Sequence, residues 1–214
     1  LVLDRGQILD WFSSDLIFNL TISAVMFLFV YFLMYFTKSK TLYPKELFFD
    51  KNYIGGLIFV FLFGLLLVPP FILMPDFLSS IGGFPIDKIG IILTTSGIGG
   101  MIGTLLASRL LSYGYYKSLM IVGLIAYMIG QFYMTLWNSD VTMNMMMING
   151  IIRGLGIGLF YPALATATYV SLPSKFRDHG ASLFQFIRNL GSAVAIAIIA
   201  VSYTHLTLPT TPYV

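Results

Sequence analysis

Long apolar stretches separated by short polar loops dominate the chain. Each stretch reaches the ~20 residues that an α-helix needs to cross about 30 Å of hydrocarbon. They run over residues 16–36, 53–75, 89–108, 118–137, 145–170 and 181–201. This pattern predicts an all-α integral membrane protein, a multi-span bundle of about six transmembrane helices.

The two ends of the chain differ from the six-span part at 16–201. Residues 1–15 are mixed and polar, and we expect an extracytoplasmic loop that follows a preceding span. Residues 202–214 are rich in Thr and Pro and too short to span a membrane, and we interpret them as a non-native tail. The sequence opens abruptly at Leu1 without an initiator Met, which predicts a fragment of a longer protein.

The charge of the loops alternates along the chain. The segments 37–52, 109–117 and 171–180 carry lysine and arginine, whereas the loops between them carry Asp76, Asp87, Asp140 and a single cation, Lys88. Basic loops remain cytoplasmic because cations resist translocation. We therefore expect the three basic segments inside and residues 1–15 outside, with the lipid bilayer as the surrounding partner.

Composition narrows the possible classes of protein. The chain of 214 residues is 57% hydrophobic and only 10% charged, whereas soluble domains carry about 25% charge, so a water-soluble domain is excluded. The net charge of +3 resides in loops where topology explains it, and we expect no nucleic-acid partner. The absence of cysteine excludes disulfides and cysteine metal sites, and we expect no metal.

Small residues recur at every fourth position in the third and fifth stretches. They are Gly99 and Gly103 in the third, and Gly150, Gly154 and Gly158 in the fifth. Residues four apart share one face of a helix, and a face of small residues lets another helix approach closely. The glycines of GIGGMIG at 97–103 do not form a nucleotide-binding loop, because no strand precedes them and no acidic residue follows at ribose distance.

Prolines interrupt two of the predicted spans. Pro69 and Pro70 each remove a backbone donor and kink the second span, which creates either a gate hinge or a fixed bend near the outer surface. Pro162 interrupts the fifth span. The hydroxyls of Thr166 and Thr168, which follow it, can satisfy backbone groups that the proline frees.

Two arginines lie inside apolar stretches. A charged side chain at mid-membrane costs at least about 2.5–3.5 kcal/mol and usually faces a bundle interior or an aqueous cavity. Arg153 and Arg188 are therefore candidates for a transport cavity. The alternative for each is snorkelling, in which the long side chain reaches the outer surface from Arg153 or the cytoplasmic surface from Arg188.

A polar stripe follows the sixth stretch. It consists of Ser182, Gln185, Arg188, Asn189 and Ser192. Their spacings, close to i, i+3, i+4 and i+7, place them on one face of an otherwise apolar helix. A polar face is costly against lipid, so we expect this stripe to line a polar interior or to pack against another helix.

Three motifs resemble one transporter family. The first, LDRGQILDWF at 3–12, is similar to a signature of the 14-span drug:proton antiporters (EmrB/QacA-like) of the major facilitator superfamily. The second, RGLGIGLFYP at 153–162, resembles a pattern in the twelfth span of that family. The third, IRNLGSAVAIAI at 187–198, resembles a pattern in its thirteenth span. The first motif rests on Leu3, Asp4, Gly6, Gln7, Asp10, Trp11 and Phe12. Two departures are the absence of an acid from the loop around Arg109 and Ser192 in place of a second glycine after Gly191.

The resemblance implies a helix bundle of the major facilitator type, covering the end of span seven through span thirteen. It implies proton-coupled multidrug efflux, in which amphipathic drug-like compounds are exported by alternating access in a bacterial cytoplasmic membrane. The proton gradient would supply the energy without a cofactor. The N-terminal half of the same transporter would be a partner, with a periplasmic adaptor as a further candidate.

The carboxylates that handle protons lie mainly in the N-terminal half of that family, and none falls inside the six stretches here. Arg153 and Arg188 would then act electrostatically, by orienting partners or by lowering the pKa of a carboxylate elsewhere. Alternating access would rock this half against the other around a cavity at the midplane.

Other classes of protein stay open to different degrees. A major facilitator importer or metabolite exporter fits the same residues. An intramembrane enzyme would need a catalytic cluster, yet the stretches hold no Cys, His, Asp or Glu, so we expect no enzyme. A purely structural subunit would have no reason to carry desolvated arginines. The upstream sequence would separate these alternatives.

Overall fold

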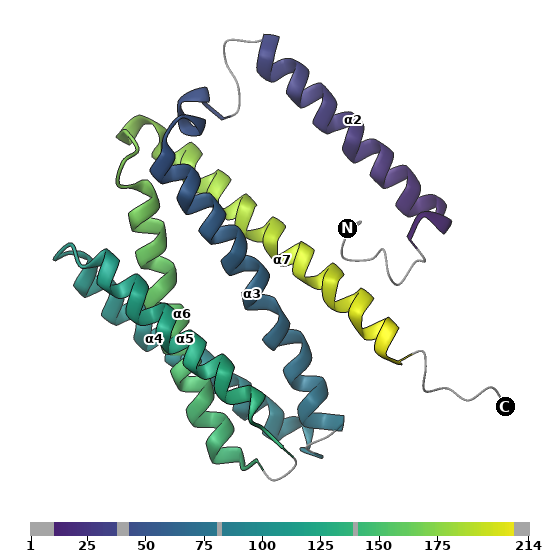
Figure 1. Cartoon of the computed structure of the whole chain (residues 1–214), viewed down its shortest axis with the longest axis vertical. Coiled ribbons are helices and arrows are strands. Elements are labelled where there is room, and N and C mark those ends of the chain that lie inside the picture. Colours follow the sequence, from purple (N-terminus) through teal and green to yellow (C-terminus); the bar gives the residue numbers. More distant parts are fainter. Residues whose placement is uncertain (1–10, 38–42, 81–82, 139–140, 208–214) are drawn as a thin grey trace. The chain divides into compact units, whose positions relative to one another are not determined.

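The computed structural model of the chain describes residues 11–37, 43–80, 83–138 and 141–207 (Figure 1). Six long helices in these ranges are long and apolar enough to cross a membrane. They are α2 (Asp15–Thr37), α3 (Lys51–Ser80), α4 (Ile86–Leu111), α5 (Tyr116–Thr135), α6 (Met143–Tyr169) and α7 (Arg177–Thr207). The predicted all-α, multi-span fold is confirmed.

Most of the helices extend beyond the apolar stretches that predicted them. The apolar run marks the part of a span inside the hydrocarbon, whereas the backbone continues its hydrogen bonding into the polar interface. The largest difference is in α7, which continues to Thr207, past the boundary that we predicted at residue 201. Whether 202–214 is a non-native tail stays a prediction.

Local chemistry sets several helix ends. The carboxylate of Asp50 accepts the backbone N–H of Tyr53 at 2.9 Å and caps the start of α3. The hydroxyl of Thr142 accepts the N–H of Met145 at 3.4 Å and caps α6. Gly114 follows α4 with φ of 84°, a left-handed conformation that glycine adopts at no steric cost.

The chain divides into two compact units. Unit 1 comprises 1–70 and 172–214, and unit 2 comprises 71–171. Unit 1 therefore holds α2, the first two thirds of α3 and α7, and unit 2 holds the end of α3 with α4, α5 and α6. The boundary between the units falls inside α3, directly after Pro70.

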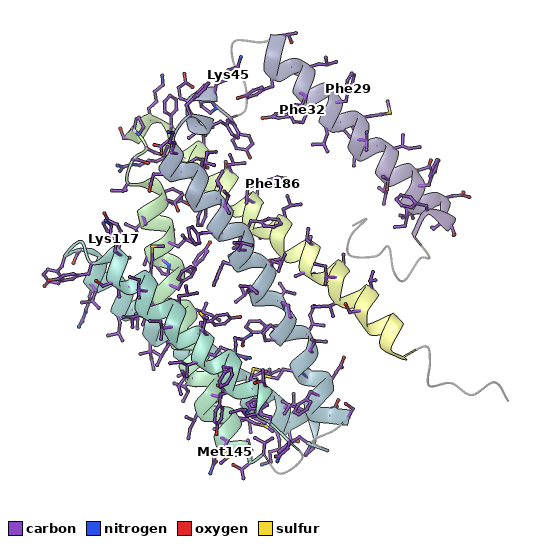
Figure 2. All side chains as sticks on the ribbon, viewed as in Figure 1. Phe29, Phe32, Lys45, Lys117, Met145 and Phe186 are labelled. Carbon is purple, nitrogen blue, oxygen red and sulfur yellow. The ribbon has the colours of Figure 1, made fainter. Side chains whose placement is uncertain are left out.

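In unit 1, α3 and α7 pack along each other. The buried hydroxyl of Tyr53 donates to the carbonyl oxygen of Gly180 at 2.8 Å. In contrast, most side chains of α2 are exposed, among them Phe29 at 63% and Phe32 at 55%, which project from the helix in Figure 2. An apolar helix with exposed aromatic side chains is suited to lipid.

In unit 2, α6 packs against both α4 and α5. A cluster of buried side chains fills the space where the end of α3 meets α4 and α6. It consists of Met74, Leu78, Ile89, Ile92 and Met146. This packing leaves α6 as the most buried helix of the unit, and α6 carries Arg153 and the row formed by Gly150, Gly154 and Gly158.

Candidate functional site

The glycines of α6 bring its backbone into direct contact with α4. A Cβ atom at Gly154 would overlap the carbonyl oxygen of Ser96, and one at Gly158 would overlap the carbonyl oxygen of Gly100. Gly150 lies in the same row, against the hydroxyl of Thr95. Backbones this close gain van der Waals contact and Cα–H···O interactions that larger side chains would prevent.

The small residues of α4 complete the same contact from the other side. A Cβ atom at Gly99 would overlap the carbonyl oxygen of Ile151, and one at Gly103 would lie 2.6 Å from the carbonyl oxygen of Leu155. The structure thus brings together the two rows of glycines that the sequence singled out. Substitution of any of them by a larger residue would separate α4 from α6.

A second close contact joins α6 to α5, and the sequence analysis missed it. A Cβ atom at Gly156 would lie 2.5 Å from the backbone nitrogen of Tyr127, and one at Gly123 would lie 2.6 Å from that of Phe160. Gly156 is two residues from Gly154, about 200° around the helix. The signal in the sequence was one glycine on each helix, Gly156 and Gly123, that does not belong to a four-residue repeat of small residues.

Arg153 lies between these two contacts, inside unit 2. Its side chain is 1% exposed, and its guanidinium donates to neutral groups. The contacts are with Gln131 Oε1 at 3.5 Å, Ser96 Oγ at 3.3 Å, Met74 Sδ at 3.6 Å and Met134 Sδ. The side chain therefore reaches into the bundle rather than to its surface, while its role in transport stays a prediction.

The neighbours of Arg153 come from three other segments: the end of α3, α4 and α5. Thioether sulfur and amide oxygen are weak or neutral acceptors, so these groups solvate the cation without neutralising it. In the part of the chain that the structure describes, no carboxylate bonds this guanidinium. Such a cation keeps most of its electric field in a medium of low dielectric constant.

Asn149 precedes Arg153 by one helical turn and is 2% exposed. Gly130 of α5 faces both: a Cβ atom there would lie 3.1 Å from Arg153 Cβ and 3.3 Å from Asn149 Oδ1. Gly130 therefore provides the space that the two polar residues occupy. The sequence analysis missed Asn149, whose signal was a polar residue four positions before Arg153 on the same helix face.

The hydroxyls near Pro162 do not act as we expected. Proline removes the donor to the carbonyl four residues earlier, which here is that of Gly158. The hydroxyl of Thr166 instead donates to Pro162 O at 2.9 Å, and that of Thr168 donates to Leu164 O at 2.7 Å. Each threonine bonds the carbonyl one turn before itself, which is the usual local preference of a hydroxyl inside a helix.

The helix α3 continues through Pro69 and Pro70. These prolines coincide with the boundary between the two compact units. A missing backbone donor at each proline weakens the helix locally. Both the gate hinge and the fixed bend fit this position.

The polar stripe of α7 lies in unit 1. Gln185 and Asn189 are exposed, whereas Arg188 and Ser192 are half-buried. Arg188 Nη2 donates to Asn189 Oδ1 at 3.1 Å, and the hydroxyl of Ser192 donates to Gly64 O of α3 at 3.3 Å. One edge of the stripe thus packs on α3, and the amides of the other edge stay exposed.

The crossing of α3 and α7 again depends on glycine. A Cβ atom at Gly64 would overlap the carbonyl oxygen of Arg188, and one at Gly191 would overlap the carbonyl oxygen of Phe61. The second glycine of the family pattern, replaced by Ser192 here, would leave the carbonyl of Gly64 without this hydroxyl. The substitution therefore adds a hydrogen bond at the crossing.

Most of the first family motif lies outside the described residues. These are Leu3, Asp4, Gly6, Gln7 and Asp10. Trp11 begins a short 3-10 helix, η1 (Trp11–Ser13), and Phe12 is 62% exposed. The motif's place relative to the membrane stays a prediction.

Comparison with known proteins identifies the family to which this chain is similar. The family model of the Major Facilitator Superfamily matches residues 53–214. The chain is 23% identical over 201 residues to Multidrug resistance protein 3 of Bacillus subtilis (strain 168), covering 94% of this chain and 39% of the relative. It is 26% identical over 225 residues to the multidrug export protein EmrB of Haemophilus influenzae, covering 100% of this chain and 44% of the relative.

A third relative is the fatty acid resistance protein FarB of Neisseria gonorrhoeae, 26% identical over 212 residues, which cover 94% of this chain and 39% of the relative. The chain thus spans about two fifths of the length of these relatives. No solved structure matches it. The resemblance seen in the sequence motifs is confirmed: the chain belongs to the Major Facilitator Superfamily of multi-pass membrane transporters and is not an enzyme.

Proposed function

We propose that this chain is part of a proton-coupled antiporter that exports amphipathic compounds. The printed names of the relatives, which refer to multidrug resistance, multidrug export and fatty acid resistance, support an amphipathic cargo. A fatty acid, which the name of one relative mentions, joins an apolar chain to a polar carboxyl group. Such molecules partition into the bilayer and need a transporter that removes them.

The observation that carries this proposal is the buried guanidinium of Arg153, bonded to neutral groups. At an effective dielectric constant of about 20, a unit charge at about 6 Å contributes close to 3 kcal/mol. That energy corresponds to a pKa change of about 2 units. A carboxylate that approaches Arg153 in one conformation and leaves in another would therefore release and rebind a proton.

That carboxylate would come from the N-terminal half of the transporter, which the family resemblance implies as a partner of this chain. The exposed amides of Gln185 and Asn189 on α7 would offer donors and acceptors to the polar group of the cargo. The two halves would rock about a shared cavity to alternate access. The transporter would lie in the bacterial cytoplasmic membrane, where a periplasmic adaptor could extend the export path.

A dye-efflux assay tests this proposal. The full-length transporter is expressed in a bacterium that lacks its own efflux pumps, and the cells are loaded with ethidium. Energised cells should export the dye, and a protonophore should abolish the export. Export that survives the protonophore would rule out proton coupling. Absence of export for several unrelated amphipathic cations would instead favour a major facilitator transporter of a single small metabolite.

A further inference from the structure

A pocket opens between α5 and α6 in unit 2. Its volume is about 280 Å³, and it is lined by Ile129, Tyr133, Met145, Ile148, Asn149 and Ile152. Ile129 is 57% exposed and Ile148 is 60% exposed, whereas Asn149 is 2% exposed. The isoleucines therefore form the mouth of the pocket, and Asn149 lies at its floor.

The amide of Asn149 is unsatisfied. Neither its nitrogen nor its oxygen has a hydrogen-bond partner among the described residues, and both atoms are buried. In an apolar medium each unmet polar group costs several kcal/mol. A membrane protein would not be expected to bear this cost for packing alone, because leucine has a similar size and no such penalty.

The depth of Asn149 indicates what meets this amide. The 27 residues of α6 give a length of about 40 Å, about 10 Å more than the hydrocarbon core. About 5 Å at each end then lies in the head-group region. Asn149 follows Met143, the first residue of α6, by about 9 Å along the axis. It therefore lies about 4 Å inside the edge of the hydrocarbon, where the polar ends of amphipathic molecules reside.

We propose that this pocket binds the head group of a long-chain carboxylic acid in its protonated form. A primary amide offers one acceptor and one donor side by side. A protonated carboxyl group presents the complementary pair, so that its O–H donates to Asn149 Oδ1 while its carbonyl oxygen accepts from Nδ2. Both unmet groups are then satisfied at once by a single neutral head group.

The size and walls of the pocket fit this ligand. Pockets that enclose a whole drug-sized molecule measure about 300–1,000 Å³, and this one is smaller. It holds the head group and the first carbons, and the rest of the chain stays in the bilayer. Both amide atoms are buried, so a ligand reaches them only when a side chain of the wall moves. Met145, at the start of α6 (Figure 2), lines the pocket and has an unbranched, flexible side chain.

Photo-labelling tests this site. The full chain is placed in nanodiscs of phosphatidylcholine, a lipid that offers hydrogen-bond acceptors but no donor, with an alkyne-tagged diazirine derivative of hexadecanoic acid. Mass spectrometry should find the label in the peptides that contain 129–133 or 145–152. Untagged hexadecanoic acid should compete, and its methyl ester, which lacks the donor, should compete at least tenfold less well.

Two variants separate the hydrogen bonds from simple partitioning. Asn149→Leu keeps the size of the side chain and should lower labelling at least tenfold. Ile148→Trp, at the exposed mouth, should block entry without touching the amide, and it keeps the test valid if the first variant folds poorly. Thr166→Val, a polar-to-apolar change elsewhere on α6, is the matched control and should label like the wild type.

Equal labelling of the wild type and Asn149→Leu would overturn the proposal, as would equal competition by the methyl ester. Loss of labelling on exchange to phosphatidylethanolamine, whose ammonium is a donor, would assign the site to a phospholipid instead. Competition by hexadecanoic acid but not by a water-soluble aromatic acid would identify a membrane-resident ligand rather than an exported aromatic compound. The assay measures binding alone, so its outcome is independent of export.

Discussion

Two glycines on α4 provide a matched test of the contact between α4 and α6. A Cβ atom at Gly99 would overlap the backbone of Ile151, whereas nothing lies within 4 Å of a Cβ atom at Gly97. Both are in the interior of the same helix, so alanine has the same effect on helix propensity at each. The variants Gly99→Ala and Gly97→Ala therefore differ in the helix contact alone.

The size of the effect follows from the geometry. To accept a methyl group at Gly99, α4 and α6 must move apart by roughly 1 Å, and a gap of that size forfeits a quarter to a half of each van der Waals contact. Overpacking of this kind typically costs about 1–3 kcal/mol. Alanine also gains about 0.5–1 kcal/mol at both positions, because glycine loses more conformational freedom in a helix, and at Gly97 no overpacking opposes this gain.

Because the propensity gain is the same in both variants, they should differ by about 1–3 kcal/mol in the free energy of unfolding, or roughly fivefold to a hundredfold in the equilibrium constant. Titration of the purified chain from a mild detergent into sodium dodecyl sulfate, followed by circular dichroism, measures this free energy. Equal stability of the two variants would show that α4 and α6 do not touch at Gly99. Greater stability of Gly99→Ala would refute the packing argument altogether.

Three further predictions concern topology and transport. Because the chain has no native cysteine, a single cysteine at Ser79 should react with an impermeant thiol reagent in intact cells, and one at Ser112 or Ser174 should react only after permeabilisation; the reverse pattern would invert the orientation. In the full-length transporter, Arg153→Ala should strongly reduce dye efflux while membrane insertion stays normal. Arg153→Lys should retain only part of the wild-type efflux, because ammonium lacks the planar donor fork of guanidinium. Wild-type efflux from the alanine variant would show that Arg153 has no role in the mechanism. Expressed by itself, the chain should insert into the membrane but should not lower dye accumulation, because alternating access requires two bundles. Protonophore-sensitive efflux by the chain alone would show that the second bundle is dispensable.

The helices could be predicted from the sequence because each depends on a local property. A run of about 20 apolar residues is read without reference to the rest of the chain. The shared face of Gly150, Gly154 and Gly158 could be predicted from an equally local pattern, because residues four positions apart lie on one face of a helix. The sequence could not identify the partner helix, because that depends on how the spans pack rather than on any one of them.

The surroundings of Arg153 could not be predicted for the same reason. Its neighbours Met74, Ser96 and Gln131 come from segments far apart in the sequence, and they meet only when α4 and α5 have packed in one register against α6. A shift of one residue along α4 would turn Ser96 away by about 100°. The contact with α5 through Gly156 was missed because a pair of single glycines has no repeat.

The glycine contacts also explain how unit 2 can hold a buried cation. Small residues draw α4 and α5 against α6, which excludes lipid from the interface and places polar atoms of both helices within reach of Arg153. Gly130 acts in a similar way, because the absence of a side chain there leaves the space that Arg153 Cβ and the Asn149 amide occupy. A methyl group at Gly130 would press on Arg153 Cβ at 3.1 Å and shift the guanidinium away from its acceptors. The close packing and the buried charge are therefore one arrangement, and a change in either alters the electric field that Arg153 presents.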